Sequence, residues 1–560
     1  AVMFHLAIHH LFEALWELAR SNGPLKFACV LLLAPTTAGL IVGLGVKFFA
    51  PEVAGSGIPQ TKAAYYNEGG RIRLRTGVWR FVMGALYIGM GNSLGREGPT
   101  VHISTAISSR VGRWAFRDPT RVQSMAPVGM AAGIAAAFNA PLSALTFVFE
   151  ELLDQFSMKA LGGMVVAVVV AAAVSRTLLG EEPVFGARIA EDYVTSAWML
   201  VALPMGLAAG LLGHAFSRGT LGMRGWFNRN RMLPSWLRPA TGGLACGVLG
   251  LTGWYVTAHF GDARHSVFSI GYDSLEQAFE NSLVVPILVA LLGLKFVAVI
   301  LNYATGGSGG LFSPTLFLGG MLGGLVGAAL ANVHHLGDWI PQFPADDKVI
   351  GGCVLLGMGA MFAAVVRCPF TSLIIIFEMT GNYSLILPLM AGNMLAWQIS
   401  RSLQPVGIYN ALLLQDGVTL RRLPAYRGAQ DYGKLPVKAI MTPEAFQLSS
   451  QETCRAALKR LKSARAMYHA YPVVDEAGGL VGVITRHELE ENEPEATIGS
   501  QLKAEKPLVV TAETSIRDAA NRMIAQDYQQ VPVVSPADER KLLGWLTLND
   551  VARQQNAVEG

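Results

Sequence analysis

A ten-residue pattern that occurs twice limits what this chain can fold into. Both copies follow the skeleton G-x-S-x-G-x-x-x-P-T, over residues 91–100 and 306–315, at an offset of 215 residues. Further matches follow each copy at an offset of 228 residues, among them Phe149-Glu150 and Phe377-Glu378. The apolar part of the chain is therefore predicted to be a duplicated structure.

Each copy is also predicted to begin a helix. Gly followed by Pro marks an abrupt helix start, because Pro suits the first helical turn and Gly lets other backbone approach closely. Residues 55–59, Gly-Ser-Gly-Ile-Pro, give a third start of this kind. At membrane depth the free N–H groups of such starts make an anion site, and irregular backbone is tolerated there only around a cavity. Broken segments at matching positions of two halves indicate the binding site of a transporter.

Composition indicates a polytopic membrane protein. Of the 560 residues, 52% are hydrophobic, only 15% are charged and 61 are glycine. The net charge of +4 is small, and basic residues gather in loops between apolar segments, which favours membrane topology over nucleic-acid binding. The five cysteines are scattered without metal-ligand spacing, so we expect free thiols and no metal site.

The chain divides into predicted segments by composition. Residues 1–24 place apolar residues at helical spacing and are predicted to form an interfacial N-terminal helix. Residues 25–415 form the duplicated membrane domain. Residues 416–436 are charged and contain Pro and Gly, as a linker would. The stretch over residues 218–238 holds five arginines and no acid, which predicts a cytoplasmic position.

The soluble tail beyond the linker is itself duplicated. Residues 471–474 and 482–485 parallel residues 531–534 and 544–547, and a helical pattern precedes each set of β-branched strands. The tail is therefore predicted to be an α/β pair of equivalent modules.

This tail resembles two cystathionine-β-synthase (CBS) modules, over residues 437–496 and 497–560. Each copy ends in T-x-x-E/D, which resembles the family's adenosine-nucleotide site, where the hydroxyl meets phosphate and the carboxylate meets ribose. The resemblance assigns these roles, and with them ATP, ADP or AMP as a ligand, to Thr485, Glu488, Thr547 and Asp550. The alternative is a module that only packs and dimerises, since many such modules bind nothing.

The membrane domain resembles the CLC family of chloride channels and chloride/proton exchangers. Residues 55–59, 95–99 and 310–314 match the family's three signatures in the expected order. The resemblance implies an α-helical polytopic homodimer with broken helices and inverted repeats, about 25–217 and 236–415, and one anion pathway per subunit. It also implies that both termini are cytoplasmic, and we expect a bacterial inner membrane.

The resemblance also assigns a central chloride site. Its donors are the hydroxyls of Ser56 and Tyr409 and the backbone N–H groups of Leu311 and Phe312. A halide needs donors without a full countercharge that would trap it. The alternative is a structural role for a Ser in a Gly-rich turn and a Tyr at a helix end.

Glu97 is the lone carboxylate of the first copy. An ionisable group inside the membrane is functional by default, because an unpaired charge there is costly. Deprotonated, its carboxylate would occupy the same N–H cradle as chloride; protonated, it would swing away, so that proton and chloride compete for one place. The alternative is an ion pair of Glu97 with Arg96 that stabilises a turn.

Glu151 distinguishes the family's two modes of transport. At the matching position the family's exchangers carry a proton-transfer glutamate, whereas its channels generally carry an apolar residue. This chain keeps the acid, which predicts chloride/proton antiport, with a passive chloride channel as the alternative. A solvated helix end formed by Glu150, Glu151 and Asp154 is the structural alternative.

Two other classes of protein are alternatives to a chloride transporter. Residues 306–309 match the G-x-S-G nucleophile motif of intramembrane serine proteases, which also need a histidine base. Only His334 and His335 follow in this half, beside a polar turn, so we expect no enzyme. A cation transporter would need several carboxylates facing a pore, and the chain has few. Chloride and protons are the expected substrates, with no required cofactor.

Overall fold

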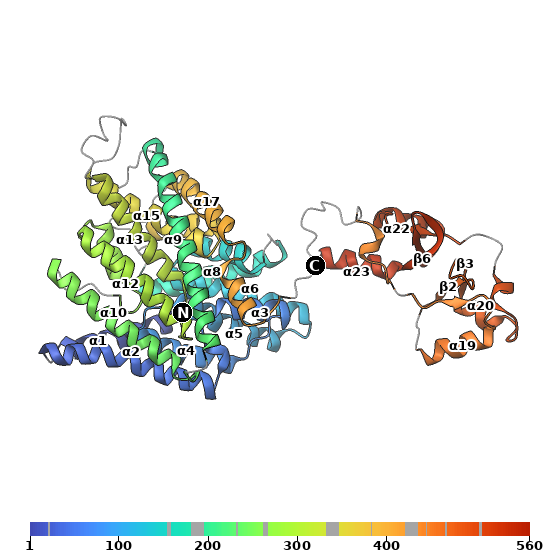
Figure 1. Ribbon diagram of the computed structural model, residues 1–560, viewed down its shortest axis with the longest axis horizontal. Helices are drawn as coiled ribbons and strands as arrows, with labels where there is room; N and C mark the ends of the chain where they lie inside the picture. The colour runs from blue at the N-terminus through green and yellow to red at the C-terminus, as the bar shows by residue number, and fades with distance from the viewer. Residues whose placement is uncertain are drawn as a thin grey trace. The chain divides into compact units, whose positions relative to one another are not determined.

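The computed structural model divides the chain into two compact units, Ala1–Arg421 and Arg422–Gly560 (Figure 1). The two units have separate hydrophobic cores. The residues that the structure describes are 1–20, 23–153, 158–180, 195–230, 233–260, 267–331, 346–381, 384–420, 435–443, 445–464, 468–502 and 507–559.

The first unit is helical throughout its described part, with η marking 3₁₀ or π turns. Its elements are α1 (Val2–Arg20), α2 (Gly23–Phe48), η1 (Pro51–Val53), α3 (Ile58–Asn67), α4 (Leu74–Gly89), α5 (Glu97–Ala115), α6 (Pro119–Phe138), α7 (Pro141–Phe147), η2 (Val148–Leu153), α8 (Met158–Leu179), α9 (Thr195–Arg229), α10 (Arg238–Phe260), α11 (Tyr272–Phe279), α12 (Val285–Ala304), α13 (Phe312–Ala331), α15 (Asp346–Val365), α16 (Pro369–Thr380), α17 (Ile386–Leu403) and α18 (Ile408–Gln415).

This unit contains both long and short helices. Among the described residues, five helices are long and apolar enough to cross a membrane, and they lie within α2, α8, α9, α12 and α13. In contrast, α3, α7, α11, α16 and α18 have only 7 to 12 residues. A helix of that length is too short to span the hydrocarbon layer. The predicted broken helices are confirmed.

The two copies of the repeated pattern meet through equivalent residues. The backbone N–H of Gly95 donates to the carbonyl of Gly310 at 2.8 Å, and the N–H of Gly310 donates to the carbonyl of Gly95 at 2.7 Å. These two glycines occupy the same place in the two copies, 215 residues apart. Reciprocal bonds between equivalent residues are what a two-fold relation between the repeats produces. The predicted duplication is therefore a structural repeat.

A second reciprocal contact joins the repeats at the starts of two short helices. The Glu150 carboxylate accepts the backbone N–H of Thr371 at 2.7 Å and its hydroxyl at 2.6 Å, at the start of α16. The Glu378 carboxylate accepts the backbone N–H of Ser143 at 2.7 Å and its hydroxyl at 2.5 Å, at the start of α7. Each carboxylate satisfies donors that the first turn of a helix leaves free. We call this pair of contacts the carboxylate clasp.

Glycines allow the repeat helices to pack closely. A Cβ on Gly319 of α13 would lie 2.3 Å from the carbonyl oxygen of Gly357 on α15, and a Cβ on Gly357 would lie 2.2 Å from that of Gly319. Small residues at such crossings let helix backbones approach within van der Waals contact in a membrane. Any larger residue at either position would push the two helices apart.

Helix α1 packs against α2 and α4. Its Phe4 and Ile8 are buried, and the Phe4 ring contacts the Phe81 ring of α4 in a tilted arrangement, at a ring-centroid distance of 5.4 Å. The interfacial position predicted for residues 1–24 stays a prediction. Most of the predicted linker, from residue 421 to residue 434, lies outside the described residues.

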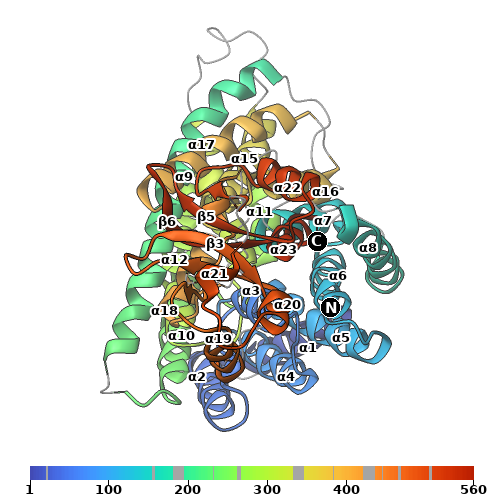
Figure 2. The same ribbon diagram turned by 90° about the vertical axis from the view of Figure 1, so that its right-hand side faces the viewer.

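The second unit contains two three-stranded sheets of the same design (Figure 2). In each sheet the first two strands are parallel and the last two are antiparallel. The elements are η5 (Val437–Ala439), β1 (Leu448–Ser449), α19 (Cys454–Ser463), β2 (Ala470–Val474), β3 (Leu480–Thr485), α20 (Arg486–Glu491), α21 (Ile498–Gln501), β4 (Val510–Thr511), α22 (Ile516–Ala525), β5 (Gln530–Ser535), β6 (Asp538–Thr547) and α23 (Leu548–Glu559).

The packing of the tail crosses the predicted boundary between its modules. Val437 belongs by sequence to the first module, yet it is buried in the core of the second, and its N–H donates to the carbonyl of Thr514 at 2.8 Å. Ile498 begins the second module by sequence, yet it is buried in the core of the first. Each module thus completes the other's core, so the two are expected to fold together.

The carboxylate clasp should contribute to stability. Glu378→Ala leaves donors at the start of α7 without an acceptor, so we expect it to destabilise the protein by about 1–3 kcal/mol. Glu378→Gln retains an acceptor oxygen and should lose less. Thermal unfolding of the purified protein in detergent measures both, with Glu68→Ala as the control because Glu68 is exposed at the end of α3. Equal unfolding temperatures for Glu378→Ala and the control would contradict the clasp.

Candidate functional site

The three Gly-Pro helix starts predicted from the sequence are in contact. The backbone N–H of Gly55 donates to the carbonyl of Gly307 at 3.1 Å. A Cβ on Gly98, in the first turn of α5, would lie 2.4 Å from the Oγ of Ser56, and one on Gly310 would lie 3.0 Å from the nitrogen of Gly98. Only glycine permits this approach. The starts of α3, α5 and α13 therefore surround one place.

Two hydroxyls assigned to chloride are buried without a partner. Ser56 and Tyr409 are 0% and 1% exposed, and neither hydroxyl has a hydrogen-bond partner among the described residues. A buried donor that lacks an acceptor costs about 1–3 kcal/mol. Such donors point to a ligand that accepts hydrogen bonds. An anion of low charge density satisfies them without a countercharge.

The start of α13 holds the other two residues predicted for chloride. Leu311 and Phe312 are both buried. The Phe312 ring packs against the rings of Phe138 and Phe362, at centroid distances of 4.7 and 4.3 Å. These aromatic contacts fix the first turn of α13, and with it the direction of its free N–H groups.

Glu97 lies against the first turn of α13, on the other repeat. Its side chain is 1% exposed. The carboxylate accepts the hydroxyl of Ser313, the backbone N–H of Ser313 at 3.4 Å and the hydroxyl of Tyr272 at 3.3 Å. Arg96 Nε stands 3.9 Å from the carboxylate, beyond hydrogen-bond distance. The ion pair with Arg96 is thus a weak contact, and the strong contacts of Glu97 cross between the repeats.

Sequence reasoning missed the two hydroxyl residues at Glu97. Ser313 stands inside the matched segment 310–314, so its hydroxyl was a signal that could have been used. Tyr272 opens α11 and belongs to no motif. Only the tertiary structure brings it to the carboxylate.

Glu151 lies in the π-helical turn η2 and is 8% exposed. The Nζ of Lys62 donates to its carboxylate at 2.8 Å, and Lys62 is itself 2% exposed. The structural alternative of a solvated helix end is therefore wrong for Glu151, while Asp154 lies outside the described residues. Lys62 was also missed, although it follows the first signature by three residues.

One cavity is lined by both Glu151 and Tyr409, one of the residues predicted for chloride. Its volume is ≈ 180 Å³. Three basic residues stand at its wall together with Glu151 and Tyr409; the lining is Lys62, Glu150, Glu151, Val366, Arg367, Trp397, Arg401, Pro405, Gly407, Tyr409 and Asn410. The cavity is thus lined by both a carboxylic acid and a hydroxyl donor that has no partner among the described residues.

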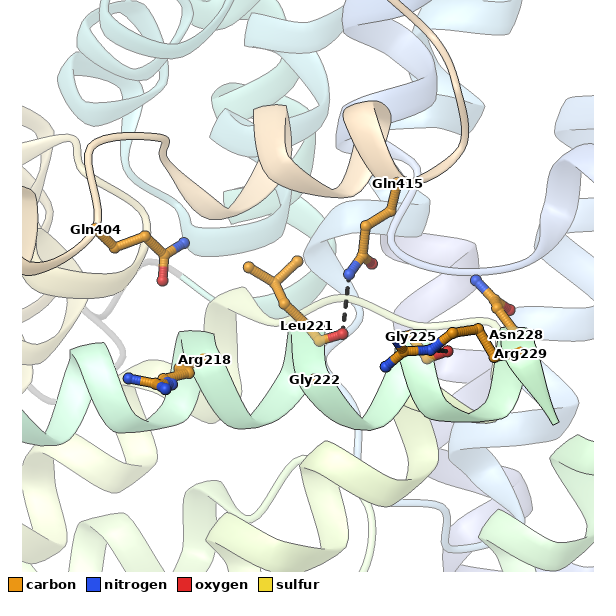
Figure 3. Close-up of a pocket in the computed structure, with 8 residues that line it drawn as sticks. All are labelled: Arg218, Leu221, Gly222, Gly225, Asn228, Arg229, Gln404 and Gln415. Atoms are coloured by element: carbon orange, nitrogen blue, oxygen red, sulfur yellow. Dashed lines mark hydrogen bonds between the residues drawn. The ribbon is translucent and has the colours of Figure 1, made fainter.

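A larger hollow lies between α9 and α18 and contains none of the predicted site residues (Figure 3). Its volume is ≈ 530 Å³, and Arg218 and Arg229 stand at its two ends. The side-chain amide of Gln415 crosses it to donate to the carbonyl of Leu221 at 2.9 Å. This bond ties α18, which carries Tyr409, to α9.

The tail residues assigned to a nucleotide contact each other. The hydroxyl of Thr485 accepts the backbone N–H of Glu488 at 3.1 Å, and the Glu488 carboxylate accepts the backbone N–H of Thr485 at 2.8 Å. Thr547 and Asp550 make the same pair of bonds, at 3.1 and 3.0 Å. Each motif is thus a reciprocal cap at a helix start. A nucleotide would have to take over these bonds, so its binding stays a prediction.

The serine protease alternative receives no support from the site. Ser308, its nucleophile, is fully buried, and its hydroxyl has no hydrogen-bond partner within the described ranges. His334 and His335 lie outside those ranges. Ser308 also has a counterpart in the other repeat, Ser93, which is buried in the same way.

Comparisons with known proteins agree with this geometry. Residues 38–401 match the family described as "Voltage gated chloride channel", and residues 437–492 and 500–556 match the CBS domain. The H(+)/Cl(-) exchange transporter ClcA of Cronobacter sakazakii is 32% identical over 422 residues, which cover 72% of this chain and 84% of the relative. ClcA of Salmonella typhi is 30% identical over 422 residues, covering 73% and 81%.

Solved structures share the fold. A slow cyanobacterial Cl−/H+ antiporter matches with a TM-score of 0.64 at 25% identity, over 74% of this chain and 93% of that one. A eukaryotic CLC transporter matches with a TM-score of 0.63 at 19% identity, over 98% and 94% of the two chains. The helical membrane domain and the tandem tail are thus found together in a known structure. This protein is a membrane protein that belongs to the CLC family of voltage gated chloride channels and carries two CBS domains.

Proposed function

We propose that this protein is a chloride/proton antiporter, which moves chloride across a membrane in exchange for protons. The observation that carries the proposal is the position of the Glu97 carboxylate. It bonds to the first turn of α13, the helix whose start is assigned to chloride. A carboxylate and a halide cannot share those donors, so protonation of one and binding of the other are linked.

Each residue then has a separate task in the proposed exchange. Ser56, Tyr409 and the backbone N–H groups of Leu311 and Phe312 hold the central chloride. Glu97, while deprotonated, takes the place of an anion beside them. When Glu97 gains a proton it no longer competes for the donors, and chloride passes. The Glu97 carboxylate and chloride thereby use the same donors in turn, and protonation of Glu97 decides which of them does.

Glu151 is the proposed group that passes protons between the cytoplasm and Glu97. Its cavity also reaches Tyr409, so the proton path and the anion path run close together. The alternative, a passive chloride channel, is favoured by one observation. The Lys62 ammonium pairs with Glu151 at 2.8 Å, and a carboxylate held in its charged form by a buried cation carries protons poorly.

We further propose a homodimer in a bacterial inner membrane, with both termini and the regulatory tail in the cytoplasm. The named relatives are bacterial exchange transporters, which supports the location. Helix α8 leaves Val166 and Val170 more than half exposed, as a face covered by lipid or by a second subunit would be. The CBS pair is the part that would sense a nucleotide.

Proton pumping in liposomes tests the proposed function. Given a chloride gradient and no proton gradient, the purified wild type should move protons uphill. Glu97→Gln mimics the protonated gate, so chloride flux should persist while proton movement stops. A chloride electrode and a pH electrode in the same chamber measure the two fluxes. Passive chloride movement by the wild type would establish the channel instead, and uphill pumping by Glu97→Gln would remove Glu97 as the gate.

The pair of Glu151 and Lys62 generates a double-mutant prediction. Glu151→Gln should abolish proton pumping and retain chloride flux. Lys62→Met strands a buried carboxylate, so we expect a loss of about 3–5 kcal/mol in stability. The double variant Lys62→Met/Glu151→Gln should recover most of that loss, because neither charge remains. Thermal unfolding supplies the stability readout, and additive losses in the double variant would show that the pair is not coupled.

The nucleotide role of the tail is tested by calorimetry on the full chain with ATP, ADP and AMP. If Asp550 contacts ribose, Asp550→Asn should remove the heat of binding, and a nucleotide at a hundredfold excess over its Kd should stabilise the wild type by about 2.7 kcal/mol. Thr453→Ala serves as the control, because Thr453 caps α19 and belongs to neither motif. The absence of heat with all three nucleotides would leave the motifs as helix caps only.

A further inference from the structure

Three hydrogen-bond donors from the second repeat converge on the Glu97 carboxylate. The hydroxyls of Ser313 and Tyr272 both lie within hydrogen-bond distance of Glu97 Oε1, and the backbone N–H of Ser313 reaches Oε2 at 3.4 Å. The two hydroxyls also contact each other at 3.0 Å. The contacts therefore join α5, α11 and α13 around a single carboxylate.

Few charged groups face this carboxylate. Arg96 on its own helix start stands 3.9 Å away, and its guanidinium donates to the carbonyl of Ala137 at 3.1 Å. From the other elements, Tyr272 of α11 and Tyr409 of α18 are the titratable groups that interact with Glu97 among the described residues. Within the described ranges no cation lies at hydrogen-bond distance from the carboxylate, so the hydroxyls supply most of what holds it in place.

Such donors favour one state of Glu97 over the other. Hydrogen bonds to an ionised carboxylate are about twice as strong as bonds between neutral groups. Protonation removes that advantage, because the bonds then join neutral groups. Donors fixed at this position therefore stabilise the deprotonated side chain in the anion path and oppose its release.

We propose that Ser313 and Tyr272 form a hydroxyl clamp that holds Glu97 in the anion path and so limits the rate of exchange. The proposal rests on the proposed function, since it needs Glu97 to be the gate. Ser313 and Tyr272 are positioning residues, because they act on transport through Glu97. The clamp sets how often the gate opens and leaves the ratio of chloride to protons unchanged.

The test is the rate of chloride exchange as a function of pH for Ser313→Ala and Tyr272→Phe in liposomes. Each change removes one oxygen atom and little else. Turnover at neutral pH should rise about tenfold, and the pH–rate profile should move about one unit towards higher pH, since a bond to a charged group is lost. The increase in turnover of the double variant should be smaller than the product of the two single increases, because the two hydroxyls contact each other. Ser124→Ala and Tyr255→Phe, both exposed, should behave as wild type.

The outcomes separate the clamp from the proposed function. If the wild type fails to pump protons, the proposed function is wrong, and the clamp, which rests on it, is wrong as well. If the wild type pumps and both variants keep its rate and pH profile, the clamp is wrong while antiport stands. Faster exchange with an unshifted profile also overturns the clamp, because it indicates a loosened site. If Ser313→Ala elutes as an aggregate in size-exclusion chromatography, the rate and pH profile of Tyr272→Phe alone test the clamp.

Discussion

Helix ends inside an apolar layer must find their hydrogen-bond partners within the protein, and the architecture of the first unit follows from this constraint. Glu150 and Glu378 satisfy the starts of α16 and α7 across the repeat. Gly95 and Gly310 satisfy each other. At Ser56 and Tyr409, where three helix starts and α18 meet, buried hydroxyl donors have no partner among the described residues. The proposed anion would satisfy these two donors.

Four carboxylates of this unit differ in what stabilises their charge. Glu150 and Glu378 accept helix-start N–H groups, and Glu151 has a buried cation, Lys62. Glu97 has hydroxyls and one long N–H contact, with Arg96 at the edge of reach. Among these four carboxylates, Glu97 is the one held mainly by hydroxyls, without a cation or paired N–H groups at short distance. This difference fits the proposed role of Glu97 as the group that moves during transport, with Glu151 as the proposed proton relay.

Much of the fold could be predicted from the sequence, because the Gly and Pro residues of the repeats determine the local backbone conformation. Gly91 and Gly306 both adopt a positive φ, 98° and 93°, and the Pro near the end of each copy predicts a helix start. The pairing of Gly95 with Gly310 could not be predicted from the sequence, because it depends on how the repeats fold onto each other. Lys62 and Tyr272 belong to no motif and reach their carboxylates only through tertiary packing. In the tail, the T-x-x-E/D motifs predict a cap and a ligand site equally well, and the structure shows the cap.

The central claim is that an anion occupies the place left open by the helix starts, between the hydroxyls of Ser56 and Tyr409. Anomalous diffraction from crystals grown in bromide tests this claim most directly, because bromide replaces chloride and scatters anomalously. The account predicts a peak within hydrogen-bond distance of both hydroxyls and of the first turn of α13, and its loss when the two hydroxyls are removed together by Ser56→Ala and Tyr409→Phe. A wild-type map with no peak there, at a bromide concentration that supports transport, would contradict the account.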